Sequence, residues 1–209
     1  MSSFRRDEDG NLHIIFTSQE VHVLMNLIEQ LLELLGESSV EAHHGDDMDP
    51  FMHLMGITGS DTPPDDPVLR RLFPNAYDDD RESAEFRRYT EYGLREKKRA
   101  HARQIYEHLA AHDDEWSADN PIERGSLEVI FPENEAMIWL GGLNDLRLAL
   151  AVRLGIGDEN STSSDKKKLE LMKDDDPMQA VYAVYSWIGW VQQSLLDLVM
   201  TFGDEHQAT

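Results

Sequence analysis

Apolar and polar residues alternate in two parts of the chain, as they do in half-buried strands. Leu12, Ile14 and Phe16 are expected on one side of a strand that follows Asp9-Gly10, a pair that favours a tight turn. Residues 3–6 and 12–16 are therefore predicted to form a hairpin. A second alternating run, at Leu127, Val129 and Phe131, predicts a third strand that pairs with it.

Four longer segments have apolar residues at the three- and four-residue spacing of helices. They are predicted at about residues 18–36, 80–111, 132–154 and 177–202. The first begins at a capping box formed by Thr17 and Glu20 and ends at Gly36. The last is apolar on most sides, as in the centre of a bundle or in a dimer interface.

The second and third predicted helices each carry a specific expectation. The buried side of the second is marked by Phe86, Tyr89, Leu94, Ile105 and Leu109. Its section between Leu94 and Ile105, where apolar residues are sparse, is expected to face solvent. In the third, Gly141-Gly142 lowers helix propensity by about 1 kcal/mol per glycine, which indicates close approach of a neighbouring backbone.

These elements predict a mainly α protein of the α+β class. The expected architecture is a bundle of three to four long helices with short helices and an antiparallel sheet of about three strands. Two of the short helices are predicted at Asp49-Pro50 and Asp66-Pro67. Residues 1–209 are expected to form a single domain, in which residues 37–66 are an acidic, partly flexible insertion and residues 155–176 a polar connection.

Composition excludes several classes of function. The 209 residues include 41 Asp and Glu against 19 Lys and Arg, which gives a net charge of −22. A charge this negative repels phosphate backbones, so nucleic-acid binding is not expected. Because cysteine is absent, disulfides, thiolate catalysis and Cys-ligated metals are excluded. Without an apolar leader or a long apolar run, the protein is expected to be cytoplasmic, with no membrane contact.

Charged residues on two predicted helices form the candidate site. Glu91 and Arg95 are four residues apart, and Asn144 and Arg147 are three apart, so each pair shares a helix face. Arg147 lies among leucines and, if buried, needs a carboxylate partner. These side chains can form either a network that fixes helix register or a pocket that binds an anion. We favour the network, because no nucleophile or phosphate-binding loop accompanies them. The predicted binding residues are Arg87, Arg88, Glu91, Arg95, Asn144 and Arg147.

Histidines offer a weaker candidate for metal binding. His108 and His112 lie one helical turn apart, but the glutamate of a zinc-protease motif is absent between them. Further ligands would have to come from the acidic insertion, at His43, His44 and His53. We therefore expect no metal site, no cofactor and no catalytic residue.

Several runs resemble one known family. They are DPVLRRLFP at residues 66–74, EFRRYTE at 85–91 and LNDLRL at 143–148. They are similar to an uncharacterised actinobacterial family, the domain of unknown function numbered two thousand and seventeen, whose members are commonly encoded beside the ClpS adaptor. The family has no established activity. The resemblance therefore implies a genomic setting and a Clp-system protein as a partner.

The sequence as a whole favours a non-enzymatic protein that acts through protein–protein contacts. Homodimerisation or partner docking is expected through the first and last predicted helices. Seven basic residues between 86 and 103, or the acidic insertion, would supply charge selectivity. The alternative is a small-molecule or metal-binding protein, or an enzyme, with an Arg-lined anion pocket.

Overall fold

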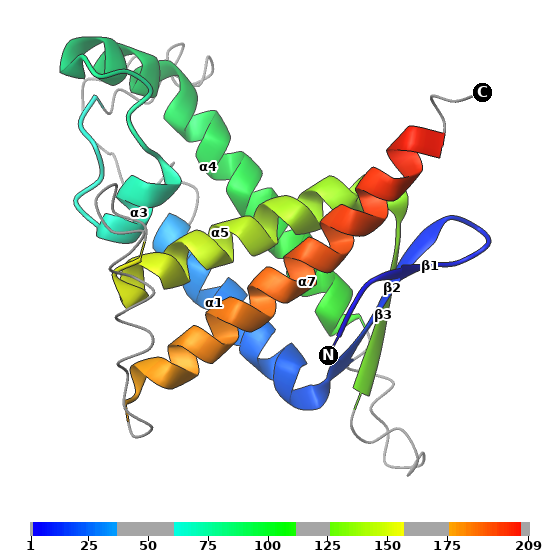
Figure 1. Ribbon diagram of the computed structural model, residues 1–209. Helices are drawn as coiled ribbons and strands as arrows, with labels where there is room; N and C mark the ends of the chain where they lie inside the picture. Colours follow the sequence, from blue (N-terminus) through cyan, green and yellow to red (C-terminus); the bar gives the residue numbers. More distant parts are fainter. Residues whose placement is uncertain (1, 37–60, 112–125, 157–175, 206–209) are drawn as a thin grey trace.

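Long helices pack against one face of a small sheet in the computed structural model, which describes residues 2–36, 61–111, 126–156 and 176–205 (Figure 1). This arrangement confirms the predicted α+β class. In chain order the elements are β1 (Arg5–Arg6), β2 (Asn11–Thr17), α1 (Ser18–Leu35), α3 (Pro67–Leu72), α4 (Asp80–Ala110), β3 (Ser126–Pro132), the 3₁₀ turn η1 (Glu133–Glu135), α5 (Ala136–Leu154) and α7 (Met178–Glu205).

The three strands are antiparallel in the order β1-β2-β3, so the predicted hairpin and third strand are confirmed. Ile14 pairs with Val129, and both side chains are buried. Since alternate residues of a strand point to opposite faces, one face of the sheet enters the core and the other remains accessible. The buried strand residues are Leu12, Ile14, Phe16, Val129 and Phe131.

Local sequence sets where α1 and α3 begin. The Thr17 hydroxyl accepts from the Glu20 amide at 3.2 Å, and the Glu20 carboxylate accepts from the Thr17 amide at 2.7 Å, which confirms the capping box. Asp66 caps α3 by accepting from the amides of Val68 and Leu69, with Pro67 at the first helical position. The helix predicted at Asp49-Pro50 lies outside the described residues.

The prediction for the buried side of α4 is wrong for three of its five residues. Ile105 and Leu109 are buried, but Phe86, Tyr89 and Leu94 are exposed. Figure 1 shows the reason: the first turns of α4 lie away from α5 and α7, so their apolar side chains have no long helix to pack against. The expectation that the middle of α4 faces solvent is also wrong, because Arg99 and Ala102 are buried there.

Helix α5 begins at Ala136 rather than at Pro132, which is the last residue of β3 and is followed by η1. The close approach predicted at Gly141-Gly142 is made by side chains of α4 rather than by a backbone. A Cβ atom on Gly142 would lie 2.3 Å from Ile105 Cδ1, and one on Gly141 would lie 2.7 Å from His101 Nδ1. The two glycines therefore let α4 lie directly against α5.

Helix α7 covers the side of α5 opposite to that region and runs antiparallel to it (Figure 1). Its buried residues Ile188, Val191 and Leu195 join a core centred on Trp139, which is fully buried. No described helix is both long enough and apolar enough to cross a bilayer.

Candidate functional site

Glu91 joins two of the predicted arginines on α4. Its carboxylate accepts from Arg87 Nη1 at 2.6 Å and from Arg95 Nη2 at 2.8 Å. The three side chains are four residues apart, so successive turns of one helix place them in a row. We call Arg87, Glu91 and Arg95 the α4 arginine cluster.

The α4 arginine cluster ties α4 to two other elements. Arg87 is buried and its Nη2 donates to the Phe73 carbonyl at 3.1 Å, directly after α3. Arg95 Nη1 donates to the Leu35 carbonyl at the end of α1, also at 3.1 Å. The Arg95 guanidinium lies 4.7 Å from the centroid of the Phe73 ring, within the range of a cation–π contact. These contacts fix the position of α4 relative to α1 and α3.

A cavity of about 210 Å³ lies beside the cluster. Its lining is mainly apolar, with Phe73, Phe86 and Leu94, while Arg87 and Glu91 contribute the charged part. Both terminal nitrogens of Arg87 already donate to protein acceptors, and its Nε is buried without one. The contacts are those of a register-fixing network, whereas anion binding by these residues stays a prediction.

The other three predicted residues do not join this cluster. Arg88 on α4 and Asn144 on α5 are exposed. Arg147 Nη1 donates to Gln192 Oε1 of α7 at 2.7 Å, and its guanidinium lies 5.2 Å from the Tyr185 ring centroid. Arg147 is half-buried, so the condition under which it would need a carboxylate partner is not met, and its contacts on α7 are an amide and a phenol ring.

An ion pair outside the six predicted binding residues joins α4 to α5. Lys98 Nζ lies 2.6 Å from Asp145 Oδ1, and Asp145 is buried. Burial raises the pKa of Asp145, although the hydrogen bond from Lys98 opposes the rise. Burial also lowers the pKa of the neighbouring His101. The sequence contains one indication of this contact. Asp145 lies three residues after Gly142 and therefore on the same face of α5, where the absence of a side chain at Gly142 lets α4 approach.

His108 contacts a tryptophan, a phenylalanine and the Glu135 carboxylate, which lies 3.2 Å from its Nε2. Trp139 Nε1 donates to His108 Nδ1 at 3.1 Å, and the imidazole stacks on the Phe131 ring. His112, His43, His44 and His53 lie outside the described residues. Within the described part of the chain, no group of three or more His, Asp or Glu side chains is arranged to hold a metal ion.

His13 lies between two carboxylates on the accessible face of the sheet. Its Nε2 is 2.7 Å from Asp7 Oδ2 and its Nδ1 is 3.1 Å from Glu128 Oε1, which also accepts from Arg5. Hydrogen bonds to Asp7 and then Glu128 raise the pKa of His13. The His13 contact in turn lowers the pKa of Asp7 from 3.8 to about 2. These side chains link β1, β2 and β3 across the sheet.

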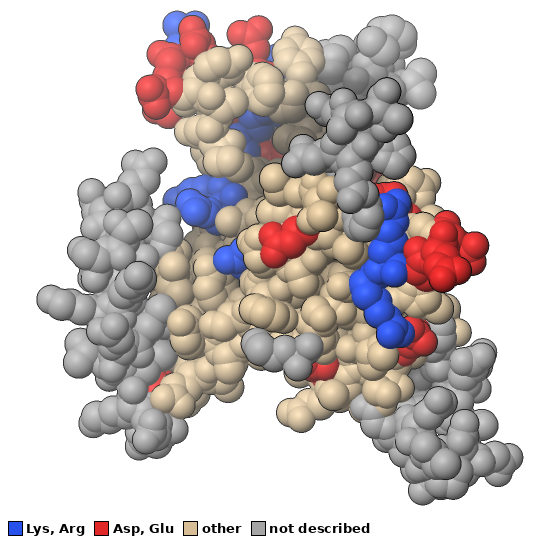
Figure 2. Space-filling view, turned by 45° about the vertical axis from the view of Figure 1, so that its right-hand side comes forward, with Lys and Arg blue, Asp and Glu red and all other residues tan. Residues whose placement is uncertain are grey.

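The side of α7 turned away from the core is almost uncharged. We call it the α7 outer face; its exposed residues are Met178, Ala183, Ser186, Trp190, Gln193, Leu196, Asp197, Met200 and Thr201. Asp197 is the one charged residue between Met178 and Thr201. Figure 2 shows that few charged side chains lie over this part of the surface. The other helix proposed for docking, α1, contributes no large exposed apolar side chain among the described residues.

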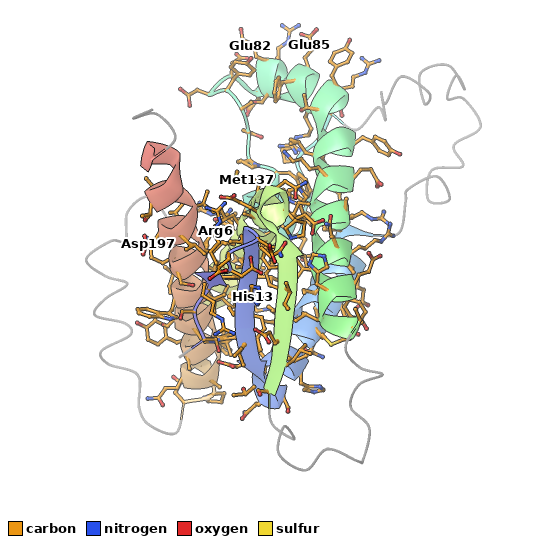
Figure 3. All side chains as sticks on the ribbon, turned by 90° about the vertical axis from the view of Figure 1, so that its right-hand side faces the viewer. Arg6, His13, Glu82, Glu85, Met137 and Asp197 are labelled. Carbon is orange, nitrogen blue, oxygen red and sulfur yellow. The ribbon has the colours of Figure 1, made fainter. Side chains whose placement is uncertain are left out.

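On α5, Met137 is also an exposed apolar side chain. It is 67% exposed, and Met200 on α7 is 63% exposed. The Gln192 side chain donates to the Leu140 carbonyl at 3.4 Å, which sets the level at which the two antiparallel helices meet. Figure 3 shows Met137 and Asp197 at the same end of the α5–α7 pair.

Comparisons with known proteins identify a family and several named relatives. A family model described as a domain of unknown function, DUF2017, matches residues 1–199. A protein named oxidative stress regulator AosR from Mycobacterium tuberculosis (strain ATCC 25618 / H37Rv) is 30% identical over 196 residues, which cover 87% of this chain and 78% of that protein. A protein named putative oxidative stress regulator AosR from Mycobacterium leprae (strain TN) is 29% identical over 201 residues, with coverages of 89% and 81%. No solved structure matches.

Proposed function

Because the chain belongs to the DUF2017 family, we propose that it is a regulatory protein that acts through contacts with other protein molecules. Relatives named as oxidative stress regulators support the regulatory part of this proposal. The observation that carries the contact part is the α7 outer face, an apolar helix surface exposed in a chain of net charge −22.

We propose a second copy of this chain as the first occupant of that surface. Two molecules of charge −22 repel each other wherever their acidic surfaces meet. The α7 outer face is where they can approach with the fewest like charges in contact. Trp190, which is 47% exposed near the middle of α7, has the aromatic character of an interface anchor. A two-fold dimer would pair this face with itself.

The experiment is sedimentation of the full chain over a range of concentrations, with Trp190→Glu as the test variant. Loss of the anchor and burial of a charge are expected to raise the dimer Kd at least about tenfold. The control is Tyr89→Glu, which replaces another exposed aromatic residue on α4, far from α7, and is expected to leave the Kd unchanged. A wild-type chain that remains monomeric, or equal effects of both variants, would contradict the proposal.

A Clp-system protein is the partner proposed beyond the dimer, and it rests on the genomic setting of the family. Binding of the full chain to ClpS and to Clp components can be measured by calorimetry. Complex formation at concentrations on the order of tens of micromolar is expected for a transient regulatory contact. The absence of any heat change at those concentrations would remove this partner while leaving the dimer proposal intact.

A further inference from the structure

Methionine is the only sulfur-containing residue in this chain, which has nine methionines and no cysteine. The structure describes four of the nine: Met25, Met137, Met178 and Met200. Met25 packs against the core and Met178 is 37% exposed, whereas Met137 and Met200 are the two most exposed large apolar residues described. Because oxidation of a thioether requires access by the oxidant, these two are the preferred targets among the four.

Both methionines lie at the same end of the α5–α7 pair. Gln192, Leu196 and Met200 follow one another at four-residue intervals, so they form one row along α7. On α5, Met137 lies one turn before Leu140, whose carbonyl accepts from Gln192. The antiparallel register therefore places Met137 alongside the row that leads to Met200. We call Met137, Leu196 and Met200 the methionine patch.

We propose that Met137 and Met200 are sites of reversible oxidation by hydroperoxides, and that oxidation weakens the contact made by the α7 outer face. The inference rests on the proposed function, because oxidation would regulate the dimer contact proposed there. The thioether sulfur attacks one peroxide oxygen, the O–O bond breaks, and an S–O bond forms. The sulfur loses two electrons, which the peroxide gains, and the second oxygen leaves as water or an alcohol after taking up a proton.

Conversion of the thioethers to sulfoxides makes burial of the methionine patch in an interface less favourable. It converts an apolar side chain into a polar one with a strong hydrogen-bond acceptor, and burying such a group without a donor is unfavourable. The nearest polar groups on α7 offer little compensation. The Gln193 amide already uses one of its two N–H groups to donate to Asp197 at 2.6 Å, and the Asp197 carboxylate is an acceptor. A contact built on the reduced patch is therefore expected to weaken when both sulfurs are oxidised.

The experiment treats the full chain with hydrogen peroxide and follows two quantities. Peptide mass spectrometry measures sulfoxide at each methionine over time, and sedimentation measures the dimer Kd. Met137 and Met200 are expected to be oxidised before Met25 and Met178. Their oxidation is expected to raise the dimer Kd at least about tenfold, and methionine sulfoxide reductases are expected to restore it.

Variants separate the patch from the other methionines. Met137→Leu with Met200→Leu keeps the surface apolar and removes both sulfurs, so this double variant is expected to dimerise normally and to stay dimeric in peroxide. Met178→Leu is the matched control on α7 and is expected to remain peroxide-sensitive. Met137→Gln with Met200→Gln imitates the polar product and is expected to weaken the dimer without oxidant. Circular dichroism confirms that each variant is folded.

The outcomes distinguish this inference from the proposed function. If the wild-type chain is monomeric before oxidation, the proposed dimer is wrong, and so is its regulation by oxidation. Earlier oxidation of Met25 or Met178 would overturn the assignment of the two sites. An unchanged Kd after oxidation of Met137 and Met200, or dissociation of the Met137→Leu, Met200→Leu variant in peroxide, would overturn the regulation while leaving the proposed function standing.

Discussion

Glu91 is the residue at which the contacts of α4 with α1 and α3 converge. It shares its carboxylate between a buried arginine, Arg87, and a half-buried one, Arg95. Each arginine then donates to a backbone carbonyl of another element. One carboxylate between two guanidiniums leaves a local charge of +1, so removing it exposes the two cations to mutual repulsion.

Substitution of Glu91 tests this role. Glu91→Ala leaves Arg87 buried without its charged partner, and the free energy of unfolding is expected to fall by about 3 kcal/mol. Urea denaturation measures the loss. Glu85→Ala removes an exposed glutamate from the same helix and is expected to change stability by less than about 0.5 kcal/mol. Equal effects of the two substitutions would show that the network contributes nothing beyond a surface charge.

His13 makes the stability of the sheet depend on pH. Its pKa is raised above the ordinary 6.5 in the folded protein, so its contribution is complete below pH 6.5 and is lost as the pH rises through the folded value. Asp7 has the opposite dependence. Its pKa is lowered from 3.8 to about 2, so its contribution is present above pH 3.8 and is lost as the pH falls toward 2. The cluster stabilises the sheet best between these two limits.

The His13→Gln variant isolates this dependence. Wild type is expected to exceed the variant in free energy of unfolding by more at about pH 6 than at about pH 9, because only the protonated imidazole gains from both carboxylates. Urea titrations of both proteins at the two pH values measure the difference, and the other titrating groups cancel between them. A difference that grows with pH would refute the assigned contacts of His13.

At the scale of elements, the packing of α4 on α5 depends on the absence of a side chain at Gly142. Gly142→Ala would place a Cβ 2.3 Å from Ile105 Cδ1, and Ile105 is buried, so the two helices must separate or Ile105 must leave its rotamer. The expected net cost is about 1 kcal/mol, because overpacking costs about 2 kcal/mol and the higher helix propensity of alanine offsets about half of it. Thermal and urea denaturation measure it, and a neutral or stabilising effect would contradict the packing.

Gly93 is the matched control for that substitution. It lies in α4, and a Cβ built there meets no atom within 4 Å. Gly93→Ala is therefore expected to stabilise the protein by about 0.5–1 kcal/mol through helix propensity alone. The pair of glycines thus separates a requirement for space from the general effect of glycine in a helix.

At the scale of the whole molecule, the net charge of −22 opposes any self-association. The Debye length falls from about 30 Å at 0.01 M ionic strength to about 3 Å at 1 M, so salt screens repulsion between the acidic surfaces of two copies. The dimer Kd, measured by sedimentation, is therefore expected to decrease as NaCl rises from about 0.02 M to about 0.5 M. A Kd that increases with salt would indicate an interface built on opposite charges rather than on the α7 outer face.

The sequence by itself determined the type and order of the described long helices and strands and where α1 and α3 begin, because these depend on residues close together in the chain. The capping box at Thr17, the proline after Asp66 and the alternation in β2 and β3 each act over a few residues. The family also followed from short runs of residues. The sequence predicted three members of the α4 arginine cluster for the same reason, since Arg87, Glu91 and Arg95 share one helix face.

Only the tertiary structure decided which apolar residues remain exposed and which polar groups meet. Phe86 and Tyr89 have the spacing of a buried stripe, yet they are exposed because no long helix reaches the first turns of α4. Arg147 meets Gln192, and Lys98 meets Asp145, across 45 and 47 residues of sequence. Periodicity describes one helix at a time, whereas burial and pairing depend on the neighbour that folding brings to it. The methionine patch is such a case, because α5 and α7 form it only when packed together.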